Sequence, residues 1–228
     1  MPEVSTLVHY NEGLIRTLSL LLIITSLATV ESRNLYRSTV TLCIQALLIC
    51  GLIAAFAVGN SALYGWAAVA LVTKATIVPW LLFHYIKRRN QSEEKAIIGF
   101  GPSVAIAAII LIAAYGLTHK YIQFLAPTPQ SATGVFGTNL AVSMTIFALG
   151  IYAILTRRDA IKTVIGLCLL ENAIHLSLVS IAPTLRETAL VGVATEVVIT
   201  VALLLYVISG IQDKLGTTDT FELSELHW

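Results

Sequence analysis

The chain has 228 residues, of which 57% are hydrophobic and 12% are charged. The charged share is roughly half of that in soluble domains, and the mean hydropathy of +0.84 also argues against a soluble enzyme or binding module. The formal net charge of +1 gives no indication of nucleic-acid binding.

Seven stretches of the chain are apolar and long enough, or nearly so, to cross a bilayer. A hydrocarbon core about 30 Å thick takes about 20 helical residues to cross, and open strands would leave backbone groups unsatisfied in lipid. The stretches cover residues 11–30, 38–58, 62–86, 97–118, 138–156, 162–181 and 189–211. We therefore predict an all-α polytopic membrane protein with about seven transmembrane helices and no soluble domain large enough for an active site.

The longest loop, from His119 to Gly137, separates the first four stretches from the last three. It is too short to be a soluble domain, and we interpret it as the boundary between two structural modules. Residues 1–130 are expected to form a four-helix transmembrane module. Residues 131–228 are expected to form a three-helix transmembrane module with a short cytoplasmic tail.

The loops differ in their content of Lys and Arg, which accumulate on the cytoplasmic side of a membrane. One side carries three such residues, Arg16, Lys120 and Arg186. The other side, which includes the C-terminus, carries ten: Arg33, Arg37, Lys87, Arg88, Arg89, Lys95, Arg157, Arg158, Lys162 and Lys214. This bias predicts an N-terminus outside the cell and a C-terminus in the cytoplasm.

Four ionisable residues lie well inside the predicted spans, away from their ends: Lys74, Glu171, His175 and Glu196. Such groups cost several kcal/mol each in hydrocarbon unless they are paired or hydrated, and they commonly belong to proton relays or ion paths. His175 follows Glu171 by four residues and so shares its helix face. Lys74 is the available counter-charge, although a buried Glu can also serve only to hold a neighbouring helix in place.

Glu171 and Glu196 lie 12 and 13 positions from Pro183, which is in the short connection between spans six and seven. Two helices joined by a short loop run antiparallel, so both carboxyl groups are expected at one depth, about 18 Å from the turn. A carboxyl group poised there between burial and a nearby cation or water can take up and release a proton.

Several other residues are expected to shape the helices. Pro79 is expected to kink the third span or loosen its hydrogen bonds near Lys74, although simple tolerated packing is an equal alternative. Gly166 and Gly192 allow close helix approach. Four aromatic residues fit membrane-interface anchors: Tyr64, Trp66, Trp80 and Tyr85.

The cysteines, Cys43, Cys50 and Cys168, form no C-x-x-C motif, so no iron–sulfur or zinc site is predicted.

The last ninety residues resemble subunit K of complex I. The resemblance rests on the segment GLCLLENAIHL with Glu171, on VGVATEVVITVALLL with Glu196 and on the charged tail after Lys214. That family has three helices with one Glu in each of the last two, and Glu171 and Glu196 stand at those positions. The family orientation agrees with the Lys and Arg bias.

The whole chain resembles component E of hydrogenase 4, with the run from Lys74 to Leu82 as its marker in the first half. This resemblance implies a non-catalytic membrane-arm subunit of a formate hydrogenlyase-type nickel–iron hydrogenase in a prokaryotic inner membrane. Glu171, Glu196, Lys74 and His175 would then be proton-relay groups. The nickel–iron and iron–sulfur centres are expected in partner subunits, and no cofactor is expected in this chain. The expected partners are antiporter-like and quinone-site-like membrane subunits and peripheral hydrogenase and iron–sulfur subunits.

Two alternatives stay open at this point. The small C-type subunit of multi-subunit cation/proton antiporters is also K-like, although it normally lacks the four additional helices. A passive anchor that only organises larger pump subunits would need no relay at all.

Overall fold

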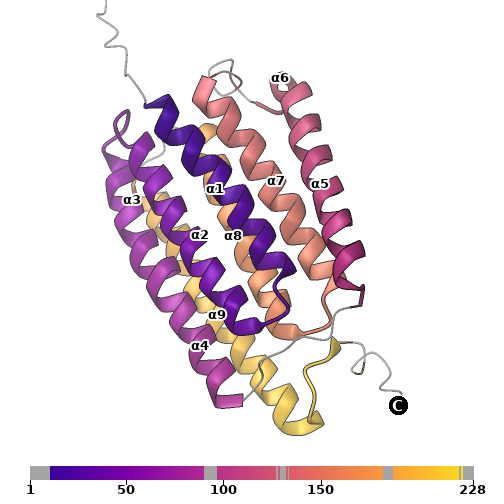
Figure 1. Cartoon of the computed structure of the whole chain (residues 1–228). Coiled ribbons are helices and arrows are strands. Elements are labelled where there is room, and N and C mark those ends of the chain that lie inside the picture. The colour runs from indigo at the N-terminus through magenta and orange to yellow at the C-terminus, as the bar shows by residue number, and fades with distance from the viewer. Residues whose placement is uncertain are drawn as a thin grey trace, which may run out of the picture.

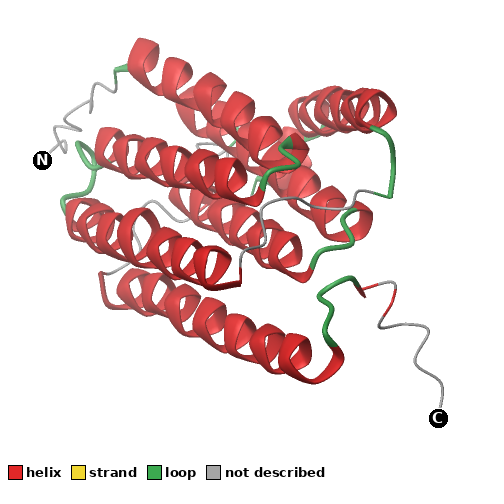
Figure 2. Cartoon of the chain, turned by 60° about the horizontal axis from the view of Figure 1, so that its bottom comes forward, coloured by secondary structure: helices red, strands yellow, loops and turns green. Residues whose placement is uncertain are grey.

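The computed structural model describes residues 11–89, 97–126, 128, 132, 134–181, 187–220 and 222. Within this part all regular structure is helical and no strand is formed (Figure 2). The helices are α1 (Glu12–Glu31), α2 (Leu35–Phe56), α3 (Ala62–Ala70), the π-helical segment η1 (Leu71–Ile77), α4 (Val78–Arg89), α5 (Phe100–Lys120), α6 (Ile122–Leu125), α7 (Gly134–Thr156), α8 (Ala160–Ile181) and α9 (Glu187–Leu215). The turn around Pro183 lies outside the described residues.

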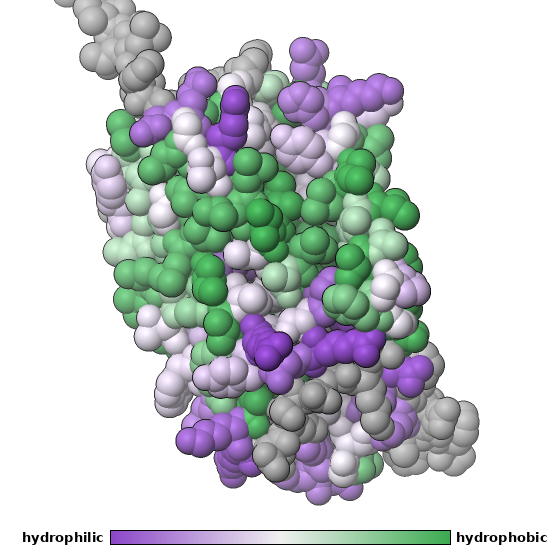
Figure 3. Space-filling view, in the orientation of Figure 1, coloured by the Kyte–Doolittle hydropathy of each residue, from purple (hydrophilic) through white to green (hydrophobic). Residues whose placement is uncertain are grey.

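Seven helices are long and apolar enough to cross a membrane, which confirms the predicted number of spans. Helices α3, η1 and α4 run together as one span, Ala62–Arg88. Figure 3 shows a broad hydrophobic band across one face, with hydrophilic residues gathered toward both ends. The chain is therefore a multi-pass membrane protein.

Polar residues set the starts of several helices. The side chains of Asn11 and Asn34 accept hydrogen bonds from the backbone N–H groups of Leu14 and Arg37, each at 3.1 Å, and so cap α1 and α2. Each bond satisfies a backbone donor that has no partner inside its own helix. At the other end of the chain, Gly216 has a φ of +74° and ends α9 in a left-handed conformation that favours glycine.

The third span is not a regular α-helix. Seven residues, Leu71–Ile77, form a π-helical segment just before Pro79, with Lys74 at its centre. Proline has no N–H for the carbonyl group four residues earlier, which is that of Ala75. The Cys43 thiol of α2 donates to this carbonyl oxygen at 3.3 Å. The predicted loosening of the helix near Lys74 is confirmed.

Helices from the two sides of the long loop pack against each other (Figure 1). Helix α7 packs most extensively on α8 and also contacts α1 and α5, while α2 contacts α8. Helix α9 contacts α3, η1 and α4 as well as α8. The third span therefore packs along α9, one of the two helices that carry the glutamates, and the Lys74 side chain of η1 contacts the other, α8.

Glycines set the close crossing of α7 and α8. A Cβ atom built on Gly166 would lie 2.8 Å from Ile154 Cγ1 and 3.3 Å from the Gly150 carbonyl oxygen, so only glycine fits without a shift. This confirms the prediction for Gly166. The prediction for Gly192 is wrong, because nothing lies within 4 Å of its built Cβ position.

Two of the four predicted interface aromatics are instead buried in the bundle. Trp66 is 1% exposed and packs inside the molecule, and Tyr85 is buried with its hydroxyl group donating to Gln212 Oε1 at 3.1 Å. Tyr64 and Trp80 are exposed, as membrane-facing anchors would be. Hydropathy alone cannot distinguish the two cases, because an aromatic ring with one polar atom suits either a buried site or a membrane interface.

Candidate functional site

The Lys74 side chain lies in the interior of the bundle, near the middle of the third span. It is 4% exposed, and its Nζ lies 3.2 Å from Glu171 Oε1, at ion-pair distance. Nζ also donates to Asn172 Oδ1 at 3.1 Å and contacts Nδ1 of His175. The structure therefore brings together three of the four residues singled out from the sequence, and Lys74 pairs within the chain.

His175 is fully buried beside this pair. Its Nε2 lies 3.7 Å from Glu171 Oε1, across one helical turn of α8. When the Lys74 ammonium donates to Nδ1, that nitrogen must accept, so the ring proton is on Nε2 and faces Glu171. The Trp66 ring, itself buried, packs against the imidazole edge-on, with centroids 5.3 Å apart.

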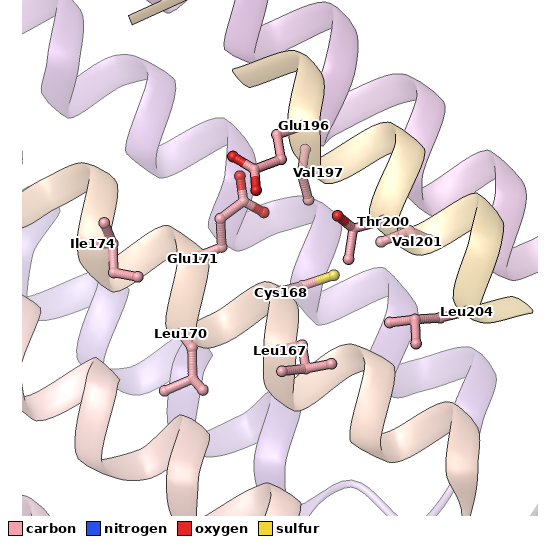
Figure 4. Close-up of a pocket in the computed structure, with 10 residues that line it drawn as sticks. All are labelled: Leu167, Cys168, Leu170, Glu171, Ile174, Glu196, Val197, Thr200, Val201 and Leu204. Atoms are coloured by element: carbon pink, nitrogen blue, oxygen red, sulfur yellow. The ribbon is translucent and has the colours of Figure 1, made fainter. Parts of the chain in front are cut away.

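Glu171 and Glu196 share one pocket between α8 and α9. The pocket has a volume of about 370 Å³ and is otherwise lined mainly by apolar side chains, together with Cys168 and Thr200. The two carboxyl groups point toward each other in it (Figure 4). Glu171 lies near the middle of α8, so the pocket lies deep in the span.

Glu196 differs from Glu171 in its exposure. The Glu171 side chain is 20% exposed, whereas Glu196 is exposed on the surface of α9. A carboxyl group at the surface of a membrane-spanning helix does not face lipid stably and requires a partner or water. The two carboxyl groups thus lead from the protein interior to its outer surface.

A row of buried amides and a hydroxyl, which the sequence analysis missed, extends from this site. Asn172 donates to Gln45 Oε1 of α2 at 3.4 Å, and Gln45 donates to the Ser26 hydroxyl group of α1 at 2.6 Å. A single amide in the apolar run of α2 was the available signal, since buried polar side chains in membranes need partners. Its partners were unpredictable, because they depend on how α1, α2 and α8 pack.

A second buried polar cluster lies at the C-terminal end of α1. Arg157 pairs with Glu31 at 3.1 Å, and the Ser103 hydroxyl group donates to the same carboxylate at 3.0 Å. Lys162 Nζ donates to the carbonyl oxygens of Thr29 and Val30 at 2.8 and 3.2 Å. This cluster joins α1, α5, α7 and α8 and lies apart from Glu171 and Glu196.

Asp159 caps α8 just outside the membrane-spanning segment. Its carboxyl group accepts from the Ile161 N–H at 2.7 Å and from the Thr218 hydroxyl group at 3.2 Å. Burial raises the pKa of this carboxyl above its ordinary value of 3.8, although these hydrogen bonds and Lys162 oppose the shift.

Metal coordination finds no support in the described part of the chain. There, no group of three or more His, Cys, Asp or Glu side chains is arranged to hold a metal ion. Cys43, Cys50 and Cys168 are free thiols.

The C-terminal part of the chain has recognisable relatives. Residues 138–228 match the family of NADH-ubiquinone/plastoquinone oxidoreductase chain 4L. A subunit 4L of an NAD(P)H-quinone oxidoreductase from Nostoc is 32% identical over 95 residues, which cover 39% of this chain and 94% of the Nostoc protein. The chain belongs to the chain 4L family. Glu171, His175 and Glu196 lie in the matched region, and Lys74 lies outside it.

Relatives that match nearly the whole chain come from hydrogenases. Component E of hydrogenase-4 from Escherichia coli K12 is 27% identical over 216 residues, which cover 93% of this chain and 97% of component E. The protein of the same name from Shigella flexneri shows the same identity and coverage. No solved structure matches the chain. The first four spans are thus shared with the hydrogenase components and extend this 4L family member beyond its matched region.

Proposed function

We propose that the chain is a membrane-arm subunit of an energy-converting nickel–iron hydrogenase, formate hydrogenlyase-type and related to complex I. In this proposal it contributes buried carboxylates to a proton path that is coupled to electron transfer in a peripheral arm. The similarity to hydrogenase-4 component E over 93% of the chain supports the hydrogenase assignment. Membership of the chain 4L family supports the relation to complex I.

The observation that carries the proposal is the contact of Lys74 with Glu171 and His175 near the middle of the membrane. An ion pair in this position must be held by the protein, because both charges are costly in hydrocarbon. The same carboxyl group opens into the pocket that contains Glu196. Four ionisable side chains therefore form one connected group.

These contacts support a specific proton step. The Lys74 ammonium group transfers a proton to His175 Nδ1, and the proton on Nε2 passes to Glu171 Oε1 when a side-chain movement shortens their 3.7 Å separation to hydrogen-bond distance. The result is a neutral amine and a neutral carboxylic acid, with the imidazole left in its other neutral tautomer. Protonated Glu171 can then pass its proton to Glu196, which faces it in the pocket (Figure 4). Release of the proton from Glu196, return of the imidazole to its first tautomer and reprotonation of Lys74 complete the cycle.

We also propose which subunits surround the chain in the assembled complex. The chain holds no redox centre, and the nickel–iron and iron–sulfur centres belong to peripheral partner subunits. Antiporter-like and quinone-site-like membrane subunits lie beside it, and one of them covers the exposed Glu196. Residues 1–130 and 131–228 form its two modules in a prokaryotic inner membrane, with the N-terminus outside and the C-terminus in the cytoplasm.

The test is redox-driven acidification in membrane vesicles that contain the assembled complex. We expect Glu171→Gln and Glu196→Gln each to leave assembly intact and to reduce acidification per electron transferred. Thr200→Val is a matched control, because it changes a polar residue of the same pocket whose hydroxyl group does not ionise at neutral pH. Unchanged acidification in both single variants and the double variant would overturn the relay and favour a passive anchor.

Partner identity is tested by affinity purification in mild detergent followed by mass spectrometry. Recovery of nickel–iron hydrogenase and iron–sulfur subunits is the expected result. Recovery of antiporter-like membrane subunits alone would contradict the hydrogenase assignment and indicate cation/proton exchange.

A further inference from the structure

The buried amides beside Lys74 form a chain of hydrogen bonds with one direction. Lys74 Nζ donates to Asn172 Oδ1 at 3.1 Å, and Asn172 Nδ2 donates to Gln45 Oε1 at 3.4 Å. Gln45 Nε2 donates to Ser26 Oγ at 2.6 Å, and this hydroxyl group donates to the Leu22 carbonyl oxygen at 2.6 Å. The chain crosses from η1 through α8 and α2 to α1.

The last acceptor determines the direction of every bond before it. A backbone carbonyl can only accept, so the Ser26 hydroxyl group uses its single proton there and must accept from Gln45. Gln45 therefore presents its NH₂ group to α1 and its oxygen to Asn172. Asn172 in turn presents its NH₂ group to Gln45 and its oxygen to the Lys74 ammonium.

Burial makes this orientation costly to reverse. Ser26 and Gln45 are fully buried, and Asn172 is 3% exposed. A flipped Asn172 amide would aim an N–H group at an ammonium and leave two buried oxygens facing each other. A buried polar group without a hydrogen-bond partner costs its full desolvation penalty, so the observed orientation is strongly favoured.

We propose that Gln45 and Ser26 are positioning residues that hold the Asn172 carbonyl toward Lys74 and thereby hold the ammonium between Glu171 and His175. This inference rests on the proposed function, since it concerns the same proton-relay site. It adds residues of α1 and α2, which lie outside the region matched to the chain 4L family. The first helices then have a direct part in setting the relay geometry.

The test is a double-mutant cycle in the vesicle assay. We expect Gln45→Leu and Asn172→Leu each to lower acidification per electron by about two- to fivefold, the effect of losing one buried hydrogen bond, and to move the pH profile of coupling. Because Gln45 acts only through Asn172, Gln45→Leu in the Asn172→Leu background should cause no further loss. Gln45→Met, of similar volume and without an amide, should reproduce Gln45→Leu and serves if that variant does not assemble.

A control on the same helix separates positioning from packing. Thr39 is fully buried in α2, and its hydroxyl group donates to the Leu35 carbonyl oxygen of its own helix. Thr39→Val should leave coupling and its pH profile unchanged. Ser26→Ala, which removes the acceptor of Gln45, should lower coupling in the same direction as Gln45→Leu.

The outcomes distinguish this inference from the function on which it rests. Normal coupling in both Gln45 variants, with coupling lost in Glu171→Gln, would overturn the positioning role and leave the relay standing. Equal losses from Gln45→Leu with and without Asn172 would also overturn it, because Gln45 would then act by another route. Normal coupling in Glu171→Gln, in Glu196→Gln and in their double variant would overturn the proposed function and the positioning role together.

Discussion

The Arg157 guanidinium group lies 3.1 Å from the Glu31 carboxylate, so the C-terminal end of α1 is tied to the segment that follows α7. Both side chains are buried, and Ser103 of α5 bonds to both of them. The Tyr152 hydroxyl group lies 2.9 Å from the Ser103 hydroxyl group. One buried cluster thus joins helices from both sides of the long loop.

Breaking this ion pair from one side should destabilise the protein strongly. Glu31→Leu removes a buried counter-charge of Arg157, and the loss of such a partner costs about 3–5 kcal/mol. The measurement is the thermal unfolding midpoint of the purified protein in detergent. Glu31→Leu combined with Arg157→Leu should be more stable than either single variant, since no uncompensated charge remains. A double variant less stable than both singles would contradict a pairwise interaction.

The α7–α8 crossing gives a prediction about packing. Gly166→Leu places a side chain where Ile154 and the Gly150 carbonyl group already lie, and overpacking of this kind costs about 1–3 kcal/mol. Gly116→Leu in α5 is the control, because its Cβ position has nothing within 4 Å and leucine favours a helix over glycine. We expect the unfolding midpoint to fall for Gly166→Leu and not to fall for Gly116→Leu. Equal effects at the two sites would show that the close crossing does not limit residue size.

Asp159 gives a prediction about pH. The pKa of its carboxyl is raised in the folded protein, so the folded state holds a proton more tightly than the unfolded state does. Its contribution to stability is therefore complete below the ordinary value of 3.8 and is lost as the pH rises through the folded pKa. The side chain of the Asp159→Asn variant stays neutral at every pH. The wild-type protein should therefore lose stability relative to this variant as the pH rises from 3.8 through the raised pKa of the folded state. Unfolding midpoints of both proteins across acidic pH measure the difference, and a constant difference would contradict the raised pKa.

The number of spans and their bounds could be predicted from hydropathy, because each crossing requires about 20 apolar residues. The scarcity of buried charges marked Lys74 as the available counter-charge, but the sequence did not tell whether it pairs within the chain or with which glutamate; the structure pairs it with Glu171. Both inferences use only the cost of polar groups in lipid, which acts locally along the chain.

The partners Gln45, Ser26 and Trp66 could not be predicted, because each contacts a residue far away in the sequence. Gln45 donates to Ser26 and accepts from Asn172, which is 127 positions away. Arg157 was assigned to a cytoplasmic loop on its charge, and its burial against Glu31 follows from the packing of α1 beside α7. Long-range packing, rather than composition, decides such contacts.

Lys74 and Lys162 are both buried and should differ in what they control. Lys74 faces Glu171 and His175, whereas Lys162 donates to the carbonyl oxygens of Thr29 and Val30 and to the Ser38 hydroxyl group. Lys74→Met removes the relay cation, and we expect acidification per electron to fall about tenfold, which corresponds to about 1.4 kcal/mol, while most of the complex still assembles. Lys162→Met removes donors to the end of α1, so it should lower the unfolding midpoint and leave the coupling of the remaining complex near normal. Acidification in vesicles and the amount of assembled complex are measured for both variants. A structural role for Lys74 would give a different result. The complex would then be lost completely in Lys74→Met, while coupling would be retained in both Lys74→Arg and Lys162→Met.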